Sequence, residues 1–138
     1  AFNASQRLAL EADPTLKYSY EGAGEKGLIA ARAIAMLSYR NQNAYRKTQS
    51  DYEEKLDDFK AASYQKYQGE KLMKRFSPQA YWTLSKAMDC HHVGRGRKSV
   101  RNALKKIKAK ALLIGLKRDI LFTTAEQRFI AKNIKDST

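Results

Sequence analysis

Helix-breaking residues are scarce in this chain, and that scarcity limits the possible folds more than any other feature. Only seven glycines and two prolines occur among its 138 residues. A β-sandwich rich in turns needs many more of them, whereas long stretches without them favour helices. Apolar residues make up 43% of the chain, enough for a single modest core. We therefore expect a mainly α fold.

Capping residues and prolines place the ends of the expected helices. The helix over 2–12 should end at Asp13, because the residue before a proline avoids the α region. Ser77 and Pro78 open another helix, with the serine as its cap and the proline in its first turn. Thr123 caps the last helix, with an acid three residues on. Further helices are expected over 27–39, 59–76 and 99–107, and an exposed loop over 41–58.

A single segment has the character of a strand. Residues 111–114 form a short, continuous apolar run, typical of a strand that is buried on both faces. One strand cannot satisfy its own backbone N–H and C=O groups, and the sequence offers no other convincing strand. We therefore expect a piece of a larger α/β protein, or a strand that pairs with another chain. Without such a partner, the strand near 111–116 should be poorly formed.

Positive charge is concentrated in one part of the chain. The formal net charge is +13, and residues 86–118 hold eleven Lys and Arg against Asp89 alone. Such a stretch suits a phosphate-bearing partner, either a nucleic acid or a nucleotide-containing cofactor, although a solvated charged face is the simpler interpretation. A basic helical module that binds nucleic acid and a helical dimerisation module are therefore alternative functions. No aromatic residue lies within 93–118, which argues against stacking on single strands.

Other site classes find little support in the sequence. Cys90, His91 and His92 are adjacent, and no second pair of ligands exists to complete a four-ligand zinc site, so we expect no metal. The lone cysteine excludes an internal disulfide. No apolar run is long enough to span a bilayer, and we expect a cytoplasmic protein without a membrane partner.

Three residues suggest chemistry. Arg32 is the only charge in an apolar helix, where a guanidinium is costly unless an anion meets it. Tyr39 lies two turns further on the same face, so the pair could hold a small carboxylate. An internal salt bridge of Arg32 is the alternative. Asp119 follows the apolar run, at the strand end where α/β proteins build sites, and such a carboxylate can orient a histidine. A simple loop aspartate is the alternative there.

Four stretches of the chain together form a recognisable pattern. They are AFNASQRLALEADP (1–14), GLIAARAIAMLSYR (27–40), the segment from SYQKYQ to VGRGR (63–97) and LLIGLKRDILFTTAEQ (112–127). They cover almost the whole chain and include the long ordered string from GEKLMKRF to VGRGR. Taken together, these stretches resemble the homoserine O-acetyltransferase family of the α/β-hydrolase superfamily.

The resemblance implies an architecture. Residues 1–21 would be a core helix and its connection, and residues 22–108 a helical lid insertion. Residues 109–138 would be the late strand, loop and helix of the hydrolase core. The expected fold is thus a mainly α region with one short strand and a flanking helix, excised from an α/β-hydrolase fold.

It also implies roles. The family moves acetyl from acetyl-CoA to the homoserine hydroxyl, in methionine biosynthesis, through an acyl-serine. Asp119 matches the triad aspartate, and Arg32 and Tyr39 match residues that grip the substrate. The serine would precede Ala1 and the histidine would follow Thr138, so this chain alone should be inert. Acetyl-CoA would be a co-substrate, with no permanently bound cofactor; its phosphates could meet the basic 95–110 stretch. The lid helices would pair two subunits into a homodimer.

Overall fold

The fold is almost entirely helical, as expected. The computed structural model describes residues 1–39 and 41–138, so Arg40, the last residue of the 27–40 string, lies outside it. Two compact units are present, Ala1–Cys90 (unit 1) and His91–Thr138 (unit 2). The division falls between Cys90, the last residue of α5, and His91. It does not fall near residue 108, because α6 packs against α7. The assignment to 1–21, 22–108 and 109–138 concerns parts of a larger enzyme and stays a prediction.

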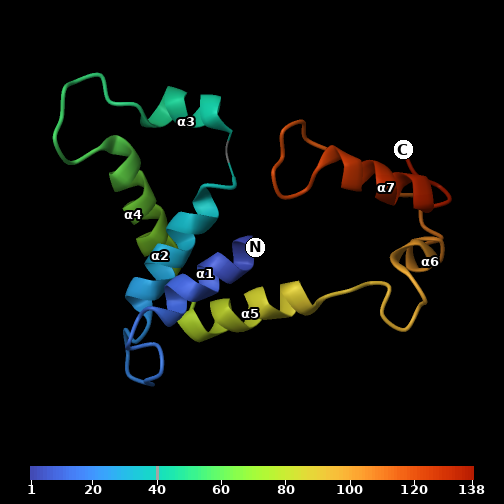
Figure 1. Ribbon diagram of the computed structural model, residues 1–138, viewed down its shortest axis with the longest axis horizontal. Helices are drawn as coiled ribbons and strands as arrows, with labels where there is room; N and C mark the ends of the chain where they lie inside the picture. The colour runs from blue at the N-terminus through green and yellow to red at the C-terminus, as the bar shows by residue number, and fades with distance from the viewer. Residues whose placement is uncertain (40) are drawn as a thin grey trace. The chain divides into compact units, whose positions relative to one another are not determined.

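Unit 1 contains five described helices (Figure 1). Four of them confirm the sequence predictions to within a few residues. Helix α2 packs against both α1 and α4, and α1 also packs against α5. The helices are α1 (Phe2–Glu11), α2 (Glu25–Met36), α3 (Gln42–Gln49), α4 (Lys60–Met73) and α5 (Pro78–Cys90).

Helix α3 corrects the prediction of a loop over 41–58. Its cap is Asn41, whose side-chain oxygen accepts a hydrogen bond from the Ala44 backbone N–H at 3.0 Å. None of its residues is buried. A helix without a buried face leaves no apolar periodicity in its sequence, so only the cap could have indicated it. The remainder of the segment, up to Asp58, is the loop that was expected.

The core of unit 1 lies where three helices cross closely. Leu10, Leu28, Ala31 and Leu72 form the buried cluster, from α1, α2 and α4. A Cβ at Gly27 would lie 2.8 Å from the Leu10 carbonyl oxygen, so α1 and α2 touch through their backbones.

A second glycine permits the crossing of α2 and α4. A Cβ at Gly69 would lie 3.0 Å from both the Cα and the carbonyl oxygen of Ile29. Positions 27 and 29 are about 200° apart around a helix. Helix α2 is thus clamped on two nearly opposite sides.

A buried carboxylate anchors the start of α2. Asp13 is 7% exposed, and its Oδ2 accepts a hydrogen bond from the Gly27 N–H at 2.9 Å. Its Oδ1 accepts from the hydroxyl and the backbone N–H of Thr15, at 2.6 and 2.9 Å. The Thr15 hydroxyl in turn accepts from the N–H of Gly24 at 2.8 Å. Asp13 thus both ends α1 and fixes the first turn of α2.

Unit 2 contains α6 (Val100–Leu104) and α7 (Thr124–Asn133). The expected capping of α7 is confirmed as a complete capping box between Thr123 and Glu126. The run near 111–116 forms no strand in the described residues, only an isolated parallel bridge between Ala111 and Ser137. The backbone groups of Ala111 and Leu113 bond to residues 136 and 138, at the end of the chain. This agrees with the expectation of a poorly formed strand.

None of the helices within residues 1–39 and 41–138 is long and apolar enough to cross a membrane.

The Asp13 network predicts a pH-dependent stability. The Thr15 hydroxyl, followed by the Gly27 N–H, lowers the pKa of Asp13 below its ordinary value of 3.8. A lowered pKa contributes stability that is present above pH 3.8 and is lost as the pH falls through the lowered value. We expect Asp13→Asn to lower the free energy of unfolding at pH 7 by about 1–3 kcal/mol, the range for hydrogen bonds to a buried charged group. The deficit should shrink below pH 3.8.

Urea unfolding followed by fluorescence of Trp82, the only tryptophan, measures this difference between pH 7 and pH 2. Glu54→Gln, which changes an exposed loop carboxylate, is the matched control and should change little. A deficit of the same size at every pH would contradict the role of the Asp13 charge.

Candidate functional site

The structure brings Arg32 and Tyr39 into contact, as predicted. Arg32 lies on α2, and Tyr39 lies in the turn that follows the helix, where its N–H donates to the Met36 carbonyl oxygen at 3.3 Å. The Arg32 Nη1 donates to the Tyr39 hydroxyl oxygen at 3.1 Å. The guanidinium carbon also lies 5.1 Å from the centroid of the Tyr39 ring, in cation–π range.

The Arg32 guanidinium has no anionic partner in the part of the chain that the structure describes. No carboxylate of residues 1–39 and 41–138 lies within 4.0 Å of it, so the alternative of an internal salt bridge is not supported there. Its Nε is buried and makes no hydrogen bond among these residues. A partly buried cation without a counter-charge is costly. An anionic ligand would offset that cost.

A second tyrosine, which the sequence analysis did not single out, belongs to this neighbourhood. Tyr81, on the first turns of α5, is partly buried against the core cluster. Its hydroxyl donates to the side-chain oxygen of Gln6 on α1, which is 7% exposed. Burial raises the pKa of Tyr81; the Tyr39 phenol adds to the rise, and the Arg32 charge opposes it. Nothing in the sequence around Tyr81 pointed to this role, because the contact joins residues 75 positions apart.

Asp119 lies in unit 2 and is considered by itself. Its Oδ1 accepts hydrogen bonds from the backbone N–H groups of Leu121 and Phe122, at 2.8 and 2.9 Å. The preceding Arg118 has a left-handed backbone with φ of 66°. Among the described residues no group donates to Oδ2. One oxygen therefore holds the loop, and the other is available to a partner such as a histidine N–H.

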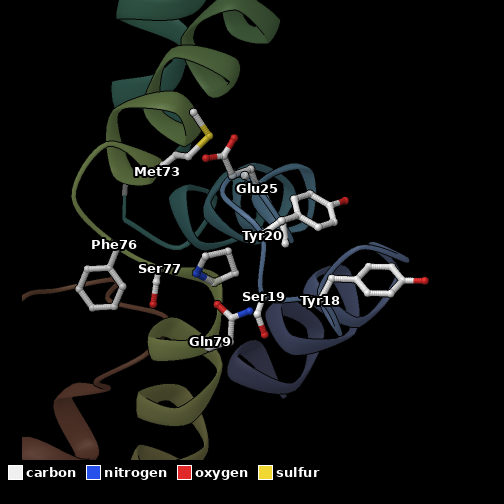
Figure 2. A pocket seen from close by; sticks show the side chains of 11 residues that line it. Tyr18, Ser19, Tyr20, Glu25, Met73, Phe76, Ser77 and Gln79 are labelled. Atoms are coloured by element: carbon white, nitrogen blue, oxygen red, sulfur yellow. The ribbon is translucent and has the colours of Figure 1, made fainter.

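Unit 1 also contains a cavity that is separate from Arg32 and Tyr39. The cavity has a volume of about 580 Å³ and lies between the loop that carries Tyr18 and Tyr20 and the junction of α4 with α5. Figure 2 shows the side chains that line it. The two tyrosine rings stack at 5.9 Å between centroids. Neither Arg32 nor Tyr39 lines this cavity, so the predicted site does not coincide with it.

The other sequence candidates are surface features. All eleven basic side chains between residues 86 and 118 are exposed. Cys90 is exposed as well. Within residues 1–39 and 41–138 no three His, Cys, Asp or Glu side chains gather as a metal site would require.

Comparison with known proteins identifies relatives of this chain. No protein-family model matches it. The homoserine O-acetyltransferase of Cyclobacterium marinum is 52% identical over 137 residues, which are 99% of this chain and 39% of that protein. The enzymes of the same name from Trichormus variabilis and Thermus thermophilus are 37% and 40% identical, over 38% and 33% of their lengths. The chain thus spans about two fifths or less of the curated relatives that it matches.

Solved structures show the same fold. The homoserine O-acetyltransferase of Bacillus anthracis matches 99% of this chain with a TM-score of 0.85 at 19% identity, over 40% of its own length. That of Staphylococcus aureus matches 99% of this chain with a TM-score of 0.72 at 27% identity, over 37% of its length. The arrangement of helices seen here is therefore the one that these enzymes contain. On the combined evidence of sequence and fold, the chain is a homologue of the homoserine O-acetyltransferases that corresponds to about two fifths of their length.

Proposed function

We propose that this chain is the part of a homoserine O-acetyltransferase that grips homoserine and orients the catalytic histidine. The enzyme would transfer acetyl from acetyl-CoA to a serine and then to the homoserine hydroxyl. The observation that carries the proposal is the contact of Arg32 with Tyr39 around a guanidinium that lacks a described counter-charge. The names of the relatives supply the substrates.

Arg32 and Tyr39 would hold the carboxylate of homoserine. A guanidinium forms two parallel hydrogen bonds with a carboxylate, which fixes orientation as well as position. Tyr39 already meets the guanidinium at 3.1 Å, so its hydroxyl lies within reach of the same ligand. Holding the substrate in this way reduces the entropic part of the reaction barrier.

Asp119 would hold the catalytic histidine in the required tautomer and stabilise its cation. Its Oδ2, which no described group occupies, is the oxygen suited to this task. The serine and the histidine would come from segments outside residues 1–138. By itself the chain would therefore be inert.

The basic surface would serve the other substrate. Exposed Lys and Arg side chains between residues 95 and 110 attract polyphosphates over a distance of about one Debye length. They would draw in the phosphates of coenzyme A, which we propose as a co-substrate and not as a bound cofactor.

The first prediction from this proposal concerns Arg32. In the full-length protein, Arg32→Ala should raise the KM for homoserine roughly 10- to 100-fold, because a hydrogen bond to a charged group contributes about 1.5–3 kcal/mol. Hydrolysis of acetyl-CoA without homoserine should change little, since the acyl-serine forms without Arg32. Steady-state kinetics with each substrate varied in turn measures both.

The matched control is Arg46→Ala, which removes an exposed arginine on α3. It should leave the KM for homoserine unchanged. If Arg32→Ala also left that KM unchanged, the proposal that Arg32 binds the homoserine carboxylate would be wrong.

The second prediction concerns Asp119. Asp119→Asn keeps a side-chain oxygen that can accept from the Leu121 and Phe122 N–H groups, so the loop should persist. The charge that stabilises the histidine cation is lost, and acetyl transfer should fall by orders of magnitude. The rate of acetyl transfer and the thermal unfolding of the same sample test the two statements together. Asp136→Asn, at an exposed position of unit 2, is the control that should remain active.

The lid helices would also pair two subunits into a homodimer. Leu84 and Met88 are four residues apart on α5, on one face, and are 53% and 64% exposed. Light scattering of the full-length protein should give the mass of a dimer. A strict monomer at micromolar concentration would contradict this.

A further inference from the structure

We propose that the hydroxyl oxygen of Tyr81 accepts a hydrogen bond from the α-ammonium group of the amino acid that Arg32 and Tyr39 hold by its carboxylate. This inference rests on the proposed function, and it adds a residue that selects amino acids over hydroxy acids. Three features carry it: the place of Tyr81 in the packing, the orientation of its hydroxyl, and the charges around it.

Packing places Tyr81 against the core to which α2, the helix of Arg32, contributes, and α5 contacts α2 directly. The Tyr81 ring lies against the buried cluster that includes Leu28 and Ala31. Leu28 precedes Arg32 by one helical turn, and Ala31 is its neighbour in the chain. The edge-to-face contact with Phe76, at 6.0 Å and 83°, fixes the plane of the ring. The electrostatic effects of both Tyr39 and Arg32 on the phenol agree with this placement.

Gln6 determines what the hydroxyl can offer. A phenol has one proton to donate and lone pairs that accept. In this structure the proton is directed to the side-chain oxygen of the buried Gln6. The phenol oxygen therefore faces any further partner as an acceptor, and a cationic N–H donor fits it.

The charges around Tyr81 leave this role to a neutral acceptor. Besides burial, the groups that shift the pKa of its phenol are Tyr39 and Arg32, and neither is a carboxylate. The acid nearest in sequence to Gln6 on α1 is Glu11, which accepts a hydrogen bond from the Trp82 indole at 2.7 Å. A carboxylate beside Arg32 would pair with the guanidinium and compete with the substrate carboxylate. A phenol oxygen satisfies the ammonium group without doing so.

A pair of substrates isolates this contact. 4-Hydroxybutanoate has the carboxylate and the hydroxyl of homoserine but lacks the ammonium group. In the full-length protein, Tyr81→Phe keeps the ring and removes the oxygen. We expect kcat/KM for homoserine to fall roughly 10- to 100-fold, the range for a hydrogen bond to a charged group. The kcat/KM for 4-hydroxybutanoate should stay within about twofold of the wild-type value. The preference for homoserine over 4-hydroxybutanoate therefore becomes smaller.

Controls separate selection from packing. Tyr67→Phe, at an exposed position of α4, should leave kcat/KM unchanged for both substrates. Gln6→Met keeps the side-chain volume but removes the acceptor of the Tyr81 hydroxyl proton. It should also reduce the preference for homoserine over 4-hydroxybutanoate, by a smaller factor than Tyr81→Phe. It provides the test should Tyr81→Phe not fold, as judged by thermal unfolding.

The outcomes distinguish this inference from the proposed function. If the wild-type protein acetylates no homoserine, the proposed function is wrong and this inference with it. If the wild type is active, but the variants lower kcat/KM equally for both substrates or for neither, only the role of Tyr81 is overturned. A loss confined to homoserine supports it.

Discussion

The close crossing of α2 with its neighbours is the constraint on which unit 1 depends. Gly27 lets the backbone of α1 touch α2, and Gly69 lets α4 touch it on the nearly opposite side. A methyl group at either position would meet backbone atoms at 3.0 Å or less, which cannot move aside as a flexible side chain can. Asp13 then fixes the first turn of the helix from within. The position of Arg32 therefore follows from packing and hydrogen bonds that lie one to two turns before it.

This clamping makes an unpaired guanidinium tolerable. The backbone at Arg32 cannot shift without unpacking Leu28 and Ala31, which are fully buried. The packing of the core compensates for the unfavourable free energy of the unsatisfied Nε. Binding sites that are preorganised for a ligand commonly contain such groups. The Tyr39 ring and hydroxyl moderate that cost without neutralising the charge.

Local signals in the sequence predicted what local interactions determine. The Asp13–Pro14 stop, the Ser77 cap and the Thr123 capping box all lie within four residues of the helix ends that they set. The spacing of Arg32 and Tyr39 predicted the pair, although Tyr39 lies in the turn after α2 and not on the helix itself. Tyr81 was missed because its partners lie on other helices, and the spacing of residues within one helix does not predict contacts with another. The α3 helix was missed because it buries nothing.

The two candidate sites differ in what holds them, and the difference follows from the nature of helices and strands. A helix satisfies its backbone within itself, so α2 can present Arg32 once its neighbours pack. The run that precedes Asp119 needs a partner strand, and Leu112, Ile114 and Leu116 remain 66% or more exposed without one. The Asp119 carboxylate is nevertheless oriented, because the N–H groups of Leu121 and Phe122 hold it locally. Hence a sheet around residues 111–116 would move the Asp119 loop as a unit, because the hydrogen bonds within that loop hold the carboxylate by Oδ1 and leave Oδ2 to another partner.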